Sequence, residues 1–162
     1  MSKNKLEVTL PSDTEILQTR IFDAPRNLVF KAYTDPAIVS QWWGPRDYEI
    51  IVDCMEVRPG GKWRVIHRDK GGNEYAFVGE YREIVPPEKI VNTFEFEPWA
   101  GRGSIENTAF EELDGKTRIT TLSEFANKED RDGMLESGME QGASESLDRF
   151  EEVLADLGED YL

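Results

Sequence analysis

Apolar positions recur most regularly near the C-terminus, across residues 127–157. Apolar or small side chains return there every three or four positions, the spacing that one face of a helix requires. The stripe consists of Leu135, Met139, Ala143, Ser146, Phe150, Val153 and Leu157. The pattern predicts one long helix lying on a flat partner, capped by Asn127 at its start and by Gly158 at its end.

Upstream, the pattern predicts a strand at 14–22, followed by two short helices. The helices start at Asp23-Ala24-Pro25 and Asp35-Pro36, because proline fits the first turn of a helix, and the second ends near Trp42. From Tyr48 onward the hydrophobic period changes to two, which is typical of strands with one buried face. We expect six strands there, at 48–57, 62–68, 74–85, 89–97, 105–113 and 117–125.

The order β-α-α-β6-α contains no alternation of strand and helix, so it predicts an α+β fold with a curved antiparallel sheet. Such a sheet must bury one face, and the C-terminal helix is the only large element available to cover it. We expect a single domain at 14–158, preceded by a flexible segment at 1–13.

Strand phase indicates which side chains face the covering helix. Trp63, Val65 and His67 alternate with basic residues in one strand, and Asn92, Phe94 and Phe96 share a face of another. These faces are rich in aromatic side chains, which suits either a packed core or the wall of an apolar cavity.

Six stretches in order resemble a known superfamily. They are Ile21-Phe22-Asp23-Ala24-Pro25, Thr34-Asp35-Pro36, Trp42-Trp43-Gly44-Pro45, Pro59-Gly60-Gly61-Lys62-Trp63-Arg64, residues 79–87 and the helix around 134–150. Together they resemble the START-like (SRPBCC) helix-grip superfamily over about residues 14–157. The branch resembles the C-terminal domain of the activator of the heat-shock-protein-90 ATPase.

The resemblance implies an internal, mostly apolar cavity between the sheet and the C-terminal helix. It does not imply one activity, because a fold hosts many functions. We expect a ligand to contact Trp42, Trp43, Trp63, Val65, His67, Phe77, Tyr81, Asn92, Phe94, Phe96, Met134, Gly138, Gln141 and Gly142. Among these, His67, Asn92 and Gln141 are the candidate polar anchors.

One departure from the resemblance concerns the middle of the helix. Relatives usually carry a tryptophan after the glycine there, whereas Gly142 is followed by Ala143 in this chain. The missing indole would leave room over the sheet, unless a neighbour such as Trp63, Phe77 or Trp99 fills the space.

Three side chains have two interpretations each. His67, the only histidine, is either a polar anchor or acid/base in the cavity or a buried histidine hydrogen bonded within the sheet. Trp42 and Trp43 are either a gate at the cavity mouth or, for at least one indole, a wedge in the core.

The composition excludes several functions. Nineteen basic against 33 acidic residues give a net charge of −14, which repels nucleic acids and anionic membranes. The single cysteine, Cys54, excludes an intramolecular disulfide, and we expect it to be buried. No apolar run of signal-peptide or membrane-spanning length is present, so we expect a cytoplasmic monomer without membrane insertion. No motif indicates a metal or another cofactor.

The leading functional hypothesis is the binding of a small hydrophobic molecule, lipid-like or aromatic, between the sheet and the helix. A second is an interaction module that regulates a chaperone, similar to the activator domain. A third is an enzyme acting on a hydrophobic substrate with His67 as acid or base, although no constellation of catalytic residues is recognisable.

Overall fold

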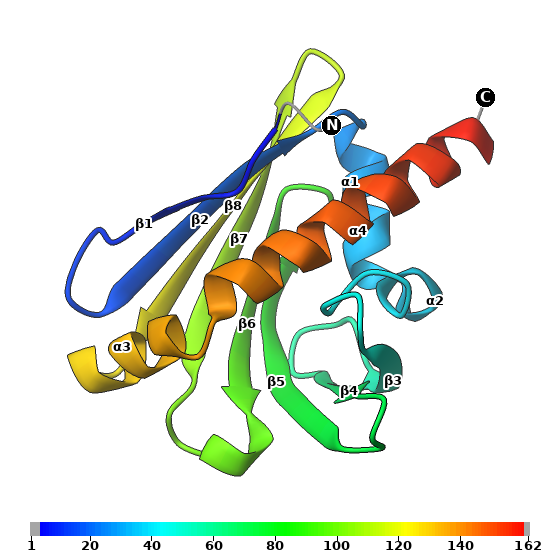
Figure 1. Cartoon of the computed structure of the whole chain (residues 1–162). Coiled ribbons are helices and arrows are strands. Elements are labelled where there is room, and N and C mark those ends of the chain that lie inside the picture. Colours follow the sequence, from blue (N-terminus) through cyan, green and yellow to red (C-terminus); the bar gives the residue numbers. More distant parts are fainter. Residues whose placement is uncertain (1–3, 161–162) are drawn as a thin grey trace.

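One antiparallel sheet of eight strands, in the order β1-β2-β8-β7-β6-β5-β4-β3, forms the frame of the computed structural model, which describes residues 4–160 (Figure 1). The strands are β1 (Glu7–Thr9), β2 (Glu15–Phe22), β3 (Glu49–Met55), β4 (Lys62–Arg68), β5 (Glu74–Val85), β6 (Lys89–Phe96), β7 (Ser104–Leu113) and β8 (Lys116–Phe125). The sheet curves, and the long helix α4 (Met139–Asp160) crosses its concave side (Figure 1). The α+β helix-grip architecture predicted from the sequence is confirmed.

Local chemistry explains where the strands turn and bend. Asp114 and Gly115 both have positive φ, as a tight hairpin turn between β7 and β8 requires. Register shifts between Val52 and Cys54 in β3 and between Tyr81 and Glu83 in β5 are bulges, which bend a sheet and increase its twist. These bulges contribute to the curvature that leaves room beneath α4.

The helices differ from the prediction in one important respect. The C-terminal helical region is two helices, α3 (Lys128–Glu136) and α4, separated at Ser137 and Gly138. Gly138 has φ +85°, a left-handed conformation that glycine adopts without steric cost and that ends α3. The Asn127 cap is present, because its Oδ1 accepts a hydrogen bond from the Asp130 N–H at 2.8 Å.

Three smaller expectations also change. The segment 1–13, for which no regular element is predicted, contains β1, which pairs with β2 through Val8 and Gln18. Gly158 does not end the last helix, because α4 continues to Asp160. Cys54 is exposed rather than buried, since the bulge after Val52 changes the alternation of β3.

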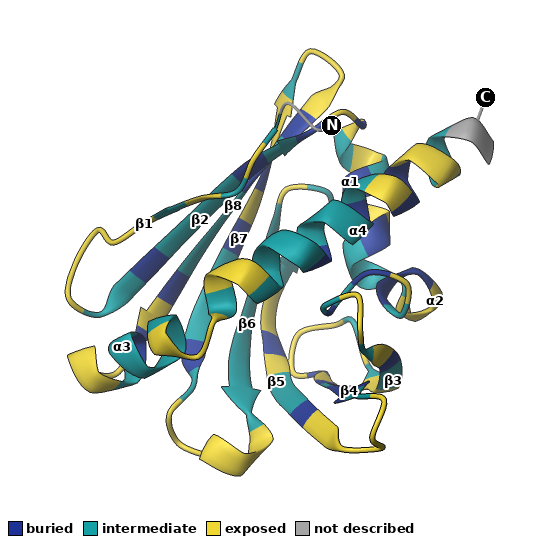
Figure 2. Cartoon of the chain, viewed as in Figure 1, coloured by how far each residue is buried: buried dark blue, intermediate teal, exposed yellow. Residues whose placement is uncertain are grey.

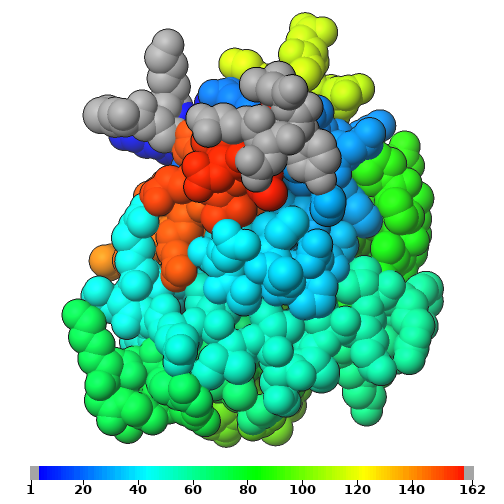
Figure 3. All heavy atoms as spheres, turned by 90° about the vertical axis from the view of Figure 1, so that its right-hand side faces the viewer, coloured from blue at the N-terminus to red at the C-terminus, as the bar shows by residue number. Residues whose placement is uncertain are grey.

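Two short helices, α1 (Arg26–Thr34) and α2 (Pro36–Val39), lie beside the C-terminal half of α4 and contribute side chains to the hydrophobic core. Phe150 of α4 is fully buried there, with its ring centroid 4.4 Å from Trp42, 5.0 Å from Phe22 and 5.1 Å from Tyr33. Seen from the side, the end of α4, the two short helices and the segment after them form one closely packed face (Figure 3).

The other half of α4 covers the sheet more loosely. Figure 2 shows intermediate burial along the middle of α4 and along much of the strands that it crosses. Among the described residues, no helix is both long and apolar enough to cross a membrane.

Candidate functional site

A cavity of about 550 Å³ lies between the concave side of the sheet and the N-terminal half of α4. All of the candidate ligand-contacting residues except Gln141 line it. They are Trp42, Trp43, Trp63, Val65, His67, Phe77, Tyr81, Asn92, Phe94, Phe96, Met134, Gly138 and Gly142. Gln141 is exposed and lies off the cavity wall, because the inward face of α4 runs through Met139, Gly142 and Ala143. Its side chain therefore does not serve as a polar anchor in this cavity.

One wall of the cavity is aromatic and comes from β4, β5, β6 and the loop after α2. The Trp43 ring lies at its centre, with ring centroids 5.7 Å from Trp63, 5.6 Å from Phe77 and 6.1 Å from Phe94. Phe77 and Phe94 are stacked at 5.7 Å. Alternation within the strands turns these rings inward, as their phase predicts.

The two adjacent tryptophans have different roles. Trp42 is 2 % exposed, and its Nε1 donates a hydrogen bond to the Ala32 carbonyl at 3.0 Å, so this indole is a core wedge. Trp43 is part of the aromatic wall. The exposed lining residues are Tyr75, at 37 %, Trp99, at 47 %, and Ser137 and Gly138, where α3 meets α4. The cavity therefore reaches the surface near Tyr75, near Trp99 and near this junction.

His67 connects the aromatic wall to the loop after α2. Its Nε2 lies 2.8 Å from the Trp43 carbonyl oxygen, an arrangement that requires the proton on Nε2. Burial lowers the pKa of His67, while the bond to Trp43 opposes this and the Arg149 charge adds to it. A Cβ on Gly44 would lie only 2.8 Å from Nε2, so glycine is needed at this approach. The geometry favours the interpretation of His67 as a hydrogen-bonded structural residue.

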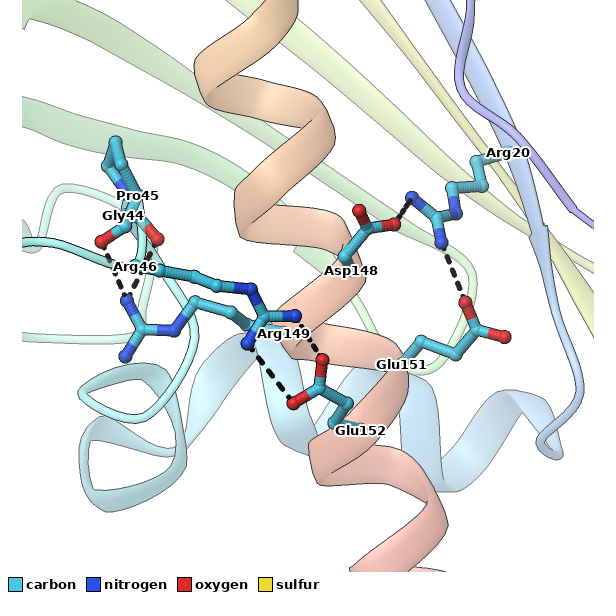
Figure 4. A network of polar contacts seen from close by, with 8 residues as sticks. All are labelled: Arg20, Gly44, Pro45, Arg46, Asp148, Arg149, Glu151 and Glu152. Carbon is cyan, nitrogen blue, oxygen red and sulfur yellow. Dashed lines mark hydrogen bonds and ion pairs between the residues drawn. The ribbon is translucent and has the colours of Figure 1, made fainter. Parts of the chain in front are cut away.

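α4 holds the same loop from the other side. Ser146 Oγ donates to the Trp42 carbonyl at 2.8 Å and accepts from the Gly44 N–H at 3.1 Å. Arg149 Nη1 donates to the carbonyls of Gly44 and Pro45, at 2.9 and 3.0 Å (Figure 4). Ser146 occupies the stripe predicted from the sequence, but its function there is polar, because it satisfies buried backbone groups.

The floor of the cavity is polar. Asn92 of β6, Glu106 of β7 and Ser123 of β8 are opposite one another in register and all line the cavity. Ser123 Oγ donates a hydrogen bond to Glu106 Oε2 at 3.0 Å. Burial raises the pKa of the Glu106 carboxyl, while hydrogen bonds from Ser123 and Asn92 act in the opposite direction. Only Asn92 of this row is predicted from the sequence.

A buried arginine joins this side of the sheet to α4. The Arg20 side chain of β2 is 1 % exposed and pairs with two carboxylates of α4. Its Nη1 lies 2.9 Å from Asp148 Oδ1, and its Nη2 lies 2.7 Å from Glu151 Oε2 (Figure 4). On the exposed side of α4, Arg46 pairs with Glu152 (Figure 4). These ion pairs join α4 to β2 on one side and to the loop after α2 on the other.

Comparison with known proteins identifies the family. Residues 23–155 match the model of the family described as Activator of Hsp90 ATPase homolog 1-like protein. The chain belongs to this family. The family is part of the START-like superfamily, so the resemblance in the sequence motifs is confirmed. No curated protein matches the chain.

Solved structures similar to this member of the activator family share its fold along nearly the whole chain. A protein from Rhodobacter sphaeroides is 20 % identical with a TM-score of 0.88, and the match covers 94 % of this chain and 99 % of that one. One from Arthrobacter aurescens is 24 % identical with a TM-score of 0.84, covering 93 % and 91 %. One from Mycobacterium smegmatis is 26 % identical with a TM-score of 0.81, covering 93 % and 98 %.

The alanine that departs from the expected family pattern lies on the cavity wall. Ala143 lines the cavity beside Gly142, where an added Cβ would meet no atom within 4 Å. Trp63 does not rise toward the helix, since a Cβ on Gly79 would lie 2.4 Å from its Nε1 and the indole therefore packs against β5. Open space thus lies under the N-terminal half of α4 in this activator-family chain.

Proposed function

We propose that this protein binds a small hydrophobic molecule, lipid-like or aromatic, in the cavity between the sheet and α4. The observation that supports this most is the cavity itself, whose volume of about 550 Å³ falls within the range of small-molecule sites. Its aromatic wall offers apolar surface, and its polar floor offers a few groups that can orient a ligand.

The test is titration with two uncharged probes, decanol for a lipid-like ligand and 2-naphthol for an aromatic one. Trp43 and Trp63 both line the cavity, so saturable quenching of tryptophan fluorescence is expected. Backbone amide shifts should change at cavity-lining residues and not on the outer face of the sheet. If neither probe alters fluorescence or amide shifts, the proposal is wrong.

A matched pair of variants locates the binding. Ala143→Trp places an indole in the cavity, whereas Ala155→Trp places one on the exposed side of the same helix. By calorimetry, decanol affinity should fall in the first variant and stay unchanged in the second. Equal affinities in both variants would place the probe outside the cavity.

A second candidate function is regulation of a chaperone through the protein surface, and the family match over residues 23–155 favours it. It predicts that the purified protein alters the ATPase rate of an Hsp90-type chaperone. Charge reversal at exposed positions of the last helices, Glu136→Lys and Glu140→Lys, should change that effect, whereas Ala143→Trp should not. If Ala143→Trp changes the effect on the ATPase rate and the charge reversals do not, the effect depends on the cavity and not on the surface.

A further inference from the structure

A carboxylate on the floor of a mostly apolar cavity requires a reason. Glu106 is flanked across the sheet by Asn92 and Ser123, and further hydroxyls line the same floor from Ser104, Thr108 and Thr121. A cavity built only to hold hydrocarbon would gain nothing from these groups, since polar side chains on its wall reduce its affinity for apolar ligands. The row lies opposite α4, on the three central strands β6, β7 and β8.

The protein itself does not neutralise Glu106. Ser123 Oγ donates one hydrogen bond to Oε2, at 3.0 Å, and Asn92 contributes another polar contact. Arg20 lines the same cavity, but its Nη1 and Nη2 are paired with Asp148 and Glu151, and only its buried Nε has no hydrogen-bond partner. Within residues 4–160, no lysine or arginine forms an ion pair with Glu106. Glu106 therefore has no cationic partner of its own in the described part of the chain.

We propose that Glu106 is the anchor for a protonated amine on an otherwise apolar ligand, whose hydrocarbon or aromatic body lies against the wall formed by Trp43, Phe77 and Phe94. The proposal rests on the proposed function, because it names the ligand class for the same cavity. An ammonium group would donate hydrogen bonds to the carboxylate and supply the missing positive charge. Burial raises the pKa of Glu106, and a bound cation would offset the desolvation responsible for that shift.

Charge complementarity selects the amine over other head groups. A ligand carboxylate beside Glu106 would place two like charges at close range inside the cavity, and such charges repel. A hydroxyl could donate to Glu106, but it would leave the negative charge in place. The expected order of affinity is therefore amine, then alcohol, then carboxylate, for ligands with the same body.

The experiment compares decylamine, decanol and decanoate, which share one chain and differ in the head group, by calorimetry below their aggregation limits. In the unmodified protein, decylamine should bind about tenfold more tightly than decanol, since a hydrogen bond to a charged group contributes at least that much. Glu106→Gln should remove this preference and leave decanol affinity unchanged. The control Glu124→Gln removes the same charge from an exposed position of β8 and should preserve the order.

Stability provides a second measurement. If Glu106 is purely structural, Glu106→Gln should unfold more easily, whereas if it is an anchor without a counterion, the variant should have equal or higher stability at neutral pH.

Equal affinity for the three probes, tighter binding of decanoate, or an amine preference that survives Glu106→Gln would overturn the proposal. If decanol binds without any amine preference, only this inference fails. If none of the three probes binds, the ligand-binding function fails with it.

Discussion

Ala143→Trp tests the cavity most directly, because it fills space that the structure shows to be open. Ala143 lies on the side of α4 that lines the cavity. A Cβ added at the neighbouring Gly142 would have no atom within 4 Å. The cavity of about 550 Å³ is what remains after Trp63 and Phe77 occupy their own places on the wall. An indole at position 143 should therefore enter it without displacing either ring.

The expected change in stability follows from area and entropy. A buried aromatic side chain covers roughly 150–250 Å², which at about 25 cal/mol per Å² corresponds to an upper bound of about 4–6 kcal/mol. Ordering the side chain and the lower helix propensity of tryptophan each offset part of this. Filled cavities commonly gain about 0.5–2 kcal/mol. Overpacking would instead lose about 1–3 kcal/mol.

Urea unfolding of Ala143→Trp and Ala155→Trp separates these outcomes. Both variants change helix propensity in the same way, so the difference between their free energies of unfolding reports the cavity. We expect Ala143→Trp to be equal to or more stable than Ala155→Trp, and to bind decanol more weakly. A deficit above about 1 kcal/mol relative to that control would refute the open cavity.

Three further predictions concern the loop and the helix break. The pKa of His67 is lowered from 6.5 by burial, so the unfolded chain takes up a proton that the native state excludes as the pH falls below about 6.5. The free energy of unfolding should therefore fall more steeply between pH 7 and the lowered native pKa than it does in His67→Gln, and parallel pH profiles would contradict this. Gly142→Ala should raise the free energy of unfolding by about 0.5–1 kcal/mol, because its Cβ has room in a helix interior. Gly138→Ala should lower the free energy of unfolding by about 1–2 kcal/mol, because φ is +85° there. Changes of the same sign for these two glycine variants in thermal melts would be inconsistent with a helix break at Gly138. Ser146→Ala should destabilise by about 1–3 kcal/mol, since it removes both buried hydrogen bonds by which the hydroxyl joins α4 to Trp42 and Gly44, and a melting temperature equal to that of the unmodified protein would disprove this.

The sheet could be predicted closely because its signals are local. β4 and β5 have the bounds expected from the sequence, since alternation and the intervening glycines specify both strands and the turn. The C-terminal region could not be predicted as well. Leu135, Met139 and Ala143 keep a helical spacing across the break, so periodicity alone does not reveal it. Gly138 permits a left-handed conformation but does not require one.

The candidate site divides in the same way. Its aromatic wall follows from strand phase, because large apolar residues alternate with charged ones. Its polar floor does not, because Ser104, Glu106 and Thr108 face inward from β7 while Ile105 lies on the other face. Polar side chains of a strand are usually assigned to the solvent-facing side, but in β7 they face the cavity. The sequence indicates which side of β7 faces inward only through Phe110, which is buried against α1 and lies on the same side as these polar residues.

The two halves of α4 differ in how they contact the rest of the fold. Its C-terminal half carries Phe150 into a cluster of aromatic rings, where burial is complete and close packing stabilises the fold. Its N-terminal half presents Gly142 and Ala143 over open space, so it contributes little packing there. Ser146 and Arg149 lie between the two and fix the loop that carries Trp43. Because the helix is anchored at one end and by this loop at its middle, the cavity can stay open without support from a collapsed core beneath it. The side chains that line the cavity therefore do not have to pack against one another as a core. Such a lining can include polar groups that suit a ligand, such as the Glu106 carboxylate.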